Sequence, residues 1–284
     1  GLVFGGLGVV LLGIAGNLEG ALEYLWAWGV GPPGFWGWLG VKELGGDSPP
    51  FSGWWWWRAT RVIDTVVEGR SLDYTIQEFP LFSFMLGDLH PHVMSLPFLL
   101  VAAGLGWALL VAPGVMGLGW LGAQGPLLAV TGLAVGALGF LNSWDLPPLL
   151  ALALGVLALR ASRDFSRAPK GEVVLSALMG AVLLVDLAFI PYLPFYRGLE
   201  TQATGVLPWR GPGTRPVHFF LVWGLFLVLL GPFFLREVIK PWAGQKWLGL
   251  AAGAAVALAP VASWLALASL LGFLGEGPRL LTLL

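Results

Sequence analysis

EFPLFSFMLGDLHPH, residues 78–92, is the stretch around which the rest of the sequence is organised. It holds two of the chain's three histidines, two carboxylates and two prolines within apolar sequence. It closes a long, polar, tryptophan-rich segment and directly precedes a long apolar run. The stretch by itself is too short to span a bilayer, and its end is too polar for ordinary core.

The composition of the chain is that of a membrane protein. Of its 284 residues, 57% are hydrophobic and 11% are charged, and the mean hydropathy is +0.81. A soluble domain carries about 25% charged residues, so this chain has too few to cover a water-facing surface. We therefore predict a polytopic membrane protein. The net charge of −1 implies no nucleic-acid partner, and the absence of cysteine excludes a disulfide framework and a thiolate site.

The apolar runs predict an all-α bundle of at least seven spans with a long extracytoplasmic loop. A first span over 2–16 is followed by the loop, 17–92, and the transmembrane helices then occupy 93–284. The spans expected in that part are 93–112, 126–141, 147–160, 173–191, 217–235 and 247–265, with a further one from about 266. We expect one integral membrane domain over 1–284. Because both ends lie within apolar runs, we also expect a longer parent chain.

Interfacial or re-entrant helices are expected within the long loop. In WWWWRATRVIDTVVE, 54–68, four adjacent tryptophans cannot all face one way, which favours a helix at the headgroup level. Arg58 and Arg61 are three residues apart and would share a face of that helix. TIQE, 75–78, has the spacing of a capping box, and a proline two residues later suits a first turn, so 79–87 is predicted as a short helix.

Basic residues in the short loops predict the orientation. The loops that follow 147–160 and 217–235 fall on one side by alternation and carry seven lysines and arginines, whereas the opposing loop, 192–216, carries three. By the positive-inside rule the richer side is cytoplasmic. The loop 17–92, the turn 142–148 and the loop 192–216 are then extracytoplasmic. Because most polar residues capable of chemistry lie in these segments, we expect the functional site on the outer face.

GDLHPH, 87–92, places Asp88, His90 and His92 at alternate positions. Alternate residues share a face in extended backbone, and a proline after His90 favours that conformation. One carboxylate and two imidazoles are a candidate divalent-metal set that lacks one or two ligands. The alternative is that Asp88 caps the helix that follows and the histidines lie in the membrane interface.

Two further groups are candidate binding residues. Asn142, Trp144 and Asp145 end one span, where an ionisable residue facing a polar cavity is a functional candidate, and a turn before prolines is the equal alternative. Arg58 and Arg61 could clamp a phosphate or pyrophosphate by the fork geometry of guanidinium. They could instead contact headgroups from an amphipathic helix, and Arg197 has the same two interpretations.

Four motifs together resemble a known family. They are EFPLFSFMLGDLHPH, NSWDLP (142–147), WRATRVIDT (57–65) and GNLEG (16–20), in the family's order. The chain resembles the Chlor_Arch_YYY domain family of uncharacterised polytopic membrane proteins from Chloroflexi and archaea, over most of 1–200. Gln77 stands where an asparagine is expected. Family members have many more spans, so a catalytic carboxylate in another outer loop would lie outside this chain.

The family is similar in layout to GT-C-fold glycosyltransferases, which use polyprenyl-phosphate-linked sugars on the outer membrane face. The resemblance implies that a carboxylate takes the acceptor hydroxyl proton, and that two arginines or a metal stabilise the leaving phosphate. The candidates are Glu78, Asp88 and Asp145 as catalytic residues, Arg58, Arg61, Asn142, Trp144 and Arg197 as substrate-binding residues, and Asp88, His90 and His92 as metal ligands.

Expected partners are membrane lipids, the lipid-linked sugar donor and other membrane subunits. Two other classes of function stay open. One is a non-catalytic structural subunit, or one associated with pigment or haem, of a larger membrane complex. The other is a lipid flippase or transporter, which would place ionisable residues near mid-membrane.

Overall fold

The structure is a computed structural model that describes residues 1–13, 16–42, 44, 55–67, 70–200 and 214–239. The chain divides into two compact units. One unit is Asp88–Glu200, and the other joins Gly1–Gly87 to the chain after Glu200. The boundary falls inside the 78–92 stretch, so Glu78 belongs to a different unit from Asp88, His90 and His92.

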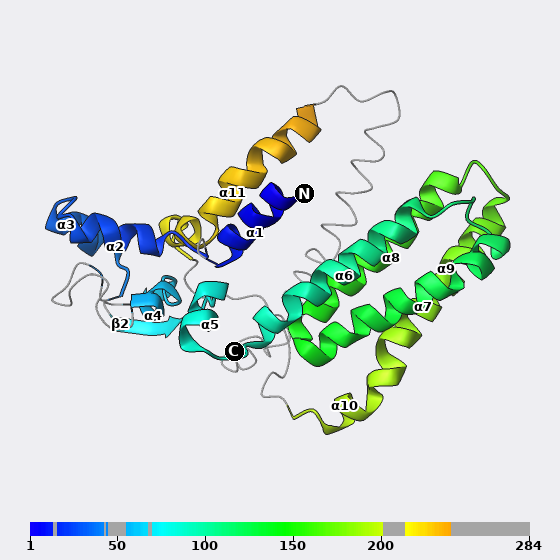
Figure 1. Cartoon of the computed structure of the whole chain (residues 1–284), viewed down its shortest axis with the longest axis horizontal. Coiled ribbons are helices and arrows are strands. Elements are labelled where there is room, and N and C mark those ends of the chain that lie inside the picture. Colours follow the sequence, from blue (N-terminus) through cyan, green and yellow to red (C-terminus); the bar gives the residue numbers. More distant parts are fainter. Residues whose placement is uncertain (14–15, 43, 45–54, 68–69, 201–213, 240–284) are drawn as a thin grey trace, which may run out of the picture. The chain divides into compact units, whose positions relative to one another are not determined.

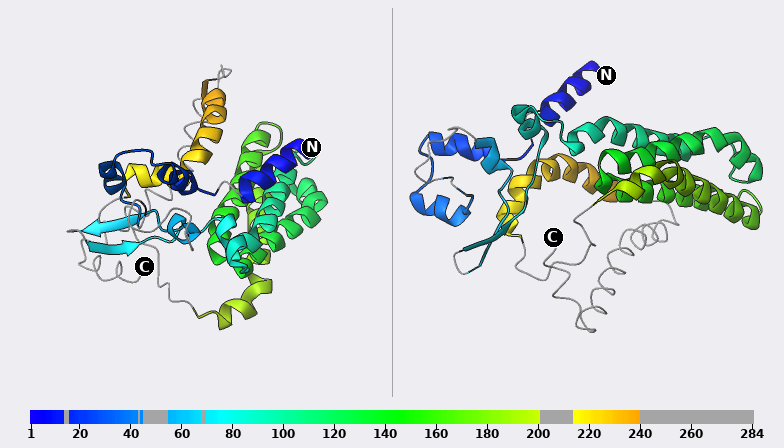
Figure 2. Two further views of the ribbon diagram at one scale, coloured as in Figure 1. Left: turned by 60° about the vertical axis from the view of Figure 1, so that its left-hand side comes forward. Right: turned by 90° about the horizontal axis from the view of Figure 1, so that it is seen from below.

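The unit Asp88–Glu200 is a bundle of four long helices that run alongside one another (Figures 1 and 2). They are α6 (Pro91–Val111), α7 (Leu118–Leu141), α8 (Leu146–Asp164) and α9 (Lys170–Phe189). The short turns η1 (Ser143–Asp145) and η2 (Ile190–Tyr192) follow α7 and α9, and α10 (Leu193–Gly198) ends the unit. Short connections make neighbouring helices antiparallel. Residues 88–92 and 142–145 therefore lie at one end of the bundle, and the loops 112–117 and 165–169 at the other.

Two glycines one turn apart allow α7 to pack closely on α9. A Cβ atom added to Gly132 would lie 2.9 Å from the carbonyl oxygen of Leu184, and one added to Gly136 would lie 2.4 Å from that of Ala188. Such small residues let helix backbones approach in membranes, where van der Waals packing drives association. The bundle core combines fully buried leucines, among them Leu128 on α7, with buried alanines and valines.

Large apolar side chains are exposed on the outside of the bundle, among them Leu100, Trp107 and Val182. The four bundle helices and α11 (Pro216–Ile239) are the five helices within the described ranges that are long and apolar enough to cross a membrane. The described structure thus supports a multi-span membrane protein, with fewer spans than the seven expected. The first expected span is α1 (Leu2–Gly13), which has 12 residues. The spans expected at 247–265 and from about 266 lie outside the described residues.

The boundaries of the spans differ from the predicted ones mainly at α7. This helix begins at Leu118 rather than at 126, because the apolar sequence before Pro126 joins the same helix and the proline lies inside it. Prolines are tolerated inside membrane helices where neighbouring groups satisfy the backbone. Helices α6 and α8 begin with prolines in their first turn, which suits proline because those N–H groups have no partner within the helix.

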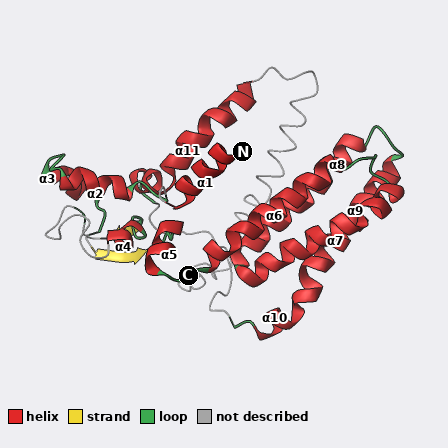
Figure 3. Ribbon diagram, in the orientation of Figure 1, coloured by secondary structure: helices red, strands yellow, loops and turns green. Residues whose placement is uncertain are grey.

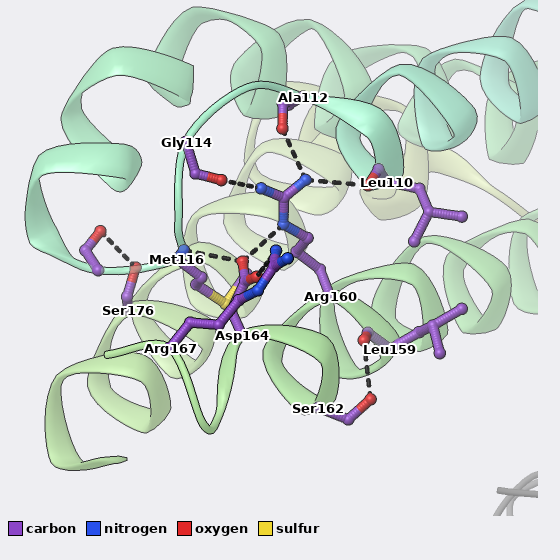
Figure 4. A network of polar contacts seen from close by, with 11 residues as sticks. Leu110, Ala112, Gly114, Met116, Leu159, Arg160, Ser162, Asp164, Arg167 and Ser176 are labelled. Carbon is purple, nitrogen blue, oxygen red and sulfur yellow. Dashed lines mark hydrogen bonds and ion pairs between the residues drawn. The ribbon is translucent and has the colours of Figure 1, made fainter. Parts of the chain in front are cut away.

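A buried ion pair locks the loop between α6 and α7 against the end of α8 (Figure 4). The Nε of Arg160 donates to Oδ2 of Asp164 at 2.8 Å, and Nη1 donates to the carbonyls of Leu110 and Ala112 at 3.0 and 2.6 Å. Asp164 also accepts the backbone N–H of Met116 at 2.9 Å. Because carbonyls at a helix end lack intrahelical donors, Arg160 supplies what the end of α6 lacks.

The other unit contains α2 (Glu19–Ala27), α3 (Pro33–Leu39), α4 (Trp55–Ala59), α5 (Pro80–Leu86), α1 and α11, together with one hairpin. Its antiparallel strands, β1 (Asp64–Val67) and β2 (Arg70–Tyr74), are the exception to the all-α prediction (Figure 3). The helix predicted over 54–68 is wrong beyond Ala59. The sequence VIDTVV, 62–67, is rich in β-branched residues, which favour extended backbone. Arg61 therefore lies beyond the helix that holds Arg58.

Helix α5 confirms the short helix predicted over 79–87. Pro80 stands in its first turn, and Gly87 ends it with φ of 70°, a left-handed conformation that glycine adopts without strain. The predicted capping box is wrong: the residue at the N-cap is Phe79, and no side chain caps the helix.

The start of α11 is attached to the end of α3. The carbonyl of Leu39 accepts from Nη1 of Arg215 at 3.0 Å and from Nε2 of His218 at 2.8 Å. The N–H of Leu18, just before α2, donates to the carbonyl of Leu221 at 2.7 Å. Buried Trp36 and Leu39 of α3 pack in one cluster with Leu221. Helices α2 and α3 are therefore fixed at the end of α11 where that helix begins.

Candidate functional site

Two of the sequence motifs meet in a buried polar cluster. We use that name for Asn17, Glu19 and Glu23, from GNLEG and the helix that follows it, and Arg58, Thr60 and Arg61, from WRATR. Glu19, Glu23 and Thr60 are fully buried, and both arginines are nearly so. Charged side chains are rarely buried unless they are paired, so the buried carboxyl groups and arginines of this cluster are expected to contact one another or other polar groups.

Glu23 and Arg58 form the ion pair at the centre of the cluster. Nη2 and Nε of Arg58 donate to the same oxygen, Oε1 of Glu23, at 2.7 and 2.9 Å. Helix α2 contributes the carboxylate and α4 contributes the guanidinium, 35 residues later in the chain. Removing water from both charges is costly, and their attraction and hydrogen bonds offset that cost.

Glu19 is the second carboxyl group of the cluster. It lies one turn before Glu23 on the same face of α2, where like charges repel. Burial and the nearby charge of Glu23 together raise the pKa of Glu19 from 4.5 to about 9, and the charge of Arg58 opposes the change. No described group donates a hydrogen bond to either carboxyl oxygen of Glu19. Glu19 is therefore protonated at neutral pH.

Arg61 lies against the backbone and a ring. Its guanidinium carbon is 3.4 Å from the centroid of the Trp57 ring, a close cation–π contact. Nη1 donates to the hydroxyl of Thr60 at 2.5 Å and to the carbonyl of Trp57 at 3.3 Å. The two predicted phosphate-binding arginines are thus both buried in the protein, Arg58 against Glu23 and Arg61 against Trp57 and Thr60.

Asn17 and Gly16 explain why GNLEG contacts WRATR. The Nδ2 of Asn17 donates to the carbonyl of Ala59 at 2.7 Å, and its Oδ1 accepts the backbone N–H of Glu19 at 3.0 Å. A Cβ on Gly16 would lie 2.1 Å from the Phe79 ring, so only glycine fits there. The N–H of Gln77 donates to the carbonyl of Thr60 at 2.7 Å. The segment before α5 is therefore joined to the same cluster.

The cluster can do acid–base chemistry beside positive charge. Two carboxyl groups whose environments hold one protonated and the other paired are suited to proton transfer. Arginines next to such a pair can stabilise negative charge that develops on a phosphate. Perturbed ionisable groups gather at functional sites, although structural ion-pair networks also perturb them.

The GDLHPH residues begin the four-helix bundle. The side chain of Asp88 is exposed, and its Oδ2 lies 3.7 Å from Nδ1 of His90. The rings of His90 and His92 are neighbours, with centroids 5.5 Å apart. His90 is the N-cap of α6, and no side chain caps that helix, so the predicted capping by Asp88 is wrong. Among the described residues no group of three His, Cys, Asp or Glu side chains is placed to hold a metal; the metal site stays a prediction.

The other predicted site residues are distributed over both units. The Nδ2 of Asn142 donates to Oδ2 of Asp145 at 3.0 Å within η1, which matches the turn interpretation. Trp144 is exposed in the same turn. These residues share one end of the bundle with 88–92. Arg197 is exposed on α10, and Glu78 is exposed just before α5.

The sequence reasoning did not select Glu19 and Glu23 as site residues. Their signal was present: two carboxylates four residues apart directly after an apolar run, on a helix that otherwise carries no charge. Such residues in apolar surroundings are functional candidates by default. What the pattern could not provide was the partner, Arg58, which is distant in sequence.

The fold and its buried cluster define a multi-span integral membrane protein. The chain belongs to a family described as uncharacterized membrane protein (DUF2298), which matches residues 1–280. The family match supports the expected membership of an uncharacterised membrane family. No curated protein and no solved structure matches the chain.

Proposed function

We propose that this protein is a GT-C-like glycosyltransferase that uses a polyprenyl-phosphate-linked sugar at the extracytoplasmic face of the cell membrane. The observation that supports this most directly is the buried cluster, which combines a proton-accepting carboxylate with two arginines directly after an apolar helix. Transfer from a lipid phosphate to a hydroxyl group needs both of these functions. The similarity of the family's layout to GT-C enzymes is a second, fold-level support.

In the proposed reaction the acceptor hydroxyl oxygen attacks the anomeric carbon of the donor sugar. The bond from that carbon to the phosphate oxygen breaks, and its electrons leave with the polyprenyl phosphate. The acceptor proton passes to a carboxylate. Glu23 is the best-supported base, because exchange of Arg58 from Glu23 to the donor phosphate would release the Glu23 carboxylate where the donor binds. Glu78, Asp88 and Asp145 remain alternative bases.

Arg58 and Arg61 would stabilise the phosphate as it leaves. Nη1 of Arg58 takes no part in the contact with Glu23, and a guanidinium can hold a phosphate by two parallel hydrogen bonds. Asn142, Trp144 and Arg197 stay candidates for binding the acceptor or donor. A divalent metal at Asp88, His90 and His92 stays the candidate cofactor.

The test is release of polyprenyl phosphate by the purified protein. The protein in lipid nanodiscs is given a short-chain polyprenyl-phosphate sugar with and without acceptor glycans, and the products are separated by chromatography. We expect cleavage of the donor by the wild type and a loss of 100-fold or more in Glu23→Gln, since base catalysis contributes about 10²–10⁴-fold. Glu200→Gln, an exposed carboxylate outside the cluster, is the matched control and should keep full activity.

Two outcomes would reject the enzyme. Transbilayer movement of an uncleaved donor in proteoliposomes would assign a flippase. Purification with pigment, haem or several stoichiometric membrane subunits, without donor cleavage, would assign a structural subunit.

A further inference from the structure

The strongest unexplained feature of the Gly1–Gly87 unit is that α2 has its polarity reversed. Its charged residues, Glu19 and Glu23, are fully buried, whereas Tyr24 on the same helix and Trp28 at its C-cap are 59% and 76% exposed. Helical spacing puts Ala21, Tyr24 and Trp28 on the face opposite Glu19. A helix in water shows the opposite arrangement, with charges outside and apolar residues inside.

Helix α3 also exposes apolar surface. Residues 24–41 carry no charged side chain over 18 positions. Trp38 is 58% exposed on α3, while Trp36 and Leu39 of the same helix are buried. The segment does not cross a bilayer as one helix, because positive-φ glycines at 29 and 31 and two prolines separate it into two short helices.

The contacts of α11 indicate where this surface lies. Helix α11 is one of the five candidate spans, and its later part is exposed and apolar, as at Leu229 and Phe233. Its first turns hold the end of α3 through Arg215 and His218 and meet Leu18 just before α2. Helices α2 and α3 are therefore attached where a spanning helix enters the bilayer, which is the level of the membrane interface.

We infer that the α2–α3 face made by Ala21, Tyr24, Trp28 and Trp38 binds the lipid surface, lying in the interface of the same leaflet that α11 enters. Tyrosine and tryptophan prefer this region because their rings are amphipathic. Interfacial helices bury their apolar face about 5–10 Å into the headgroup and acyl boundary. The opposite face of α2 then carries Glu19 and Glu23 at headgroup depth, whatever reaction the cluster performs.

Single-cysteine variants can test this directly, because the chain contains no cysteine. Ala21→Cys and Trp28→Cys in nanodiscs are labelled with a fluorophore and exposed to lipids with a nitroxide near the headgroup or deep in the acyl chain, and to aqueous iodide. Leu229→Cys on α11 is the deep control, and Ser166→Cys, exposed in a loop, is the aqueous control. Ala21→Cys exchanges one small side chain for another and keeps the test valid if Trp28→Cys misfolds.

We expect labels at 21 and 28 to be quenched at least about twofold more by the shallow nitroxide than by the deep one, in keeping with interfacial depth. Leu229→Cys should show the reverse order, and iodide should reach only the label at 166. Iodide quenching at 21 and 28 equal to that at 166, with no effect of either nitroxide, would overturn the inference and assign the face to an aqueous partner. Stronger quenching by the deep nitroxide at 21 and 28 would also overturn it.

Discussion

Arg58 directs two N–H groups at a single oxygen of Glu23, at 2.7 and 2.9 Å, and both side chains are buried. Helix α4, with four tryptophans at 54–57 before and within it, thereby binds the charged face of α2. Double donation to one oxygen leaves the second oxygen of Glu23 outside this contact. The pair is therefore a structural link between α2 and α4.

Loss of one partner of this pair should be far more harmful than a conservative change. Arg58→Met leaves Glu23 buried without its partner charge and should lower stability by about 3–5 kcal/mol. Arg58→Lys keeps the charge but cannot donate through two nitrogens, so an intermediate loss is expected. Unfolding midpoints in mixed micelles measure both effects. Arg163→Lys, at an exposed position, is the control and should leave the midpoint unchanged; equal midpoints for all variants would contradict a structural role for the pair.

Glu19 should make the stability of its unit fall as the pH rises. Its pKa is 4.5 when unfolded and about 9 when folded, so the folded state binds the proton more tightly. The stabilisation from this group is complete below pH 4.5 and is lost progressively as the pH rises to about 9, by on the order of 1 kcal/mol per unit. Glu19→Gln, which copies the neutral form, should flatten this slope and raise the unfolding midpoint at pH 8. A slope unchanged in Glu19→Gln would show that Glu19 is ionised in the folded protein.

The Arg160–Asp164 lock should dominate the stability of the four-helix bundle. Arg160→Met removes the donors to the carbonyls of Leu110 and Ala112, and it removes the positive charge that pairs with the Asp164 carboxylate. The free energy of unfolding should therefore fall by about 3–5 kcal/mol. Asp164→Asn keeps an oxygen that can accept from the N–H of Met116 and should cost less. Hydrogen exchange of 112–117 should rise in Arg160→Met. Unchanged protection in this loop would refute the lock.

Two glycines of α7 lack room for a Cβ atom, whereas a glycine of α8 has room for one, so alanine substitutions at the two kinds of position can be compared. A Cβ at Gly136 meets the backbone of α9 at 2.4 Å, so Gly136→Ala should separate α7 from α9 and cost about 1–3 kcal/mol. Gly155, in the interior of α8, has nothing within 4 Å of an added Cβ. Gly155→Ala should stabilise by up to about 1 kcal/mol, since alanine favours helix. Equal changes in the free energy of unfolding for the two variants would contradict close packing between α7 and α9.

The proposed orientation can be tested with an impermeant thiol reagent on intact cells. Ser143→Cys in η1 should label from outside, because the outer face is predicted to hold this end of the bundle. Ser166→Cys at the other end should label only after permeabilisation. The reverse pattern would place the candidate site in the cytoplasm and reject the use of an outer-face donor.

The amino-acid sequence by itself determined the membrane class and the positions of the long helices. Apolar length and scarcity of charge depend on local composition alone, and α6, α8, α9 and α11 lie close to the predicted spans. Proline rules also located α5 correctly. The predicted helix failed over 62–67, where β-branched residues favour extended backbone and the two strands pair with each other.

The tertiary structure alone decided which polar residues meet. The pattern treated Arg58 and Arg61 as two positions on one helix face and left Glu19 and Glu23 without a partner. Their association depends on the fit of Gly16 against Phe79 and on the bond from Asn17 to the carbonyl of Ala59, across 42 residues. A buried charge needs a specific partner at a specific distance, and no periodicity along one segment encodes contacts with another. The lock between Arg160 and the loop at 112–117 has the same origin.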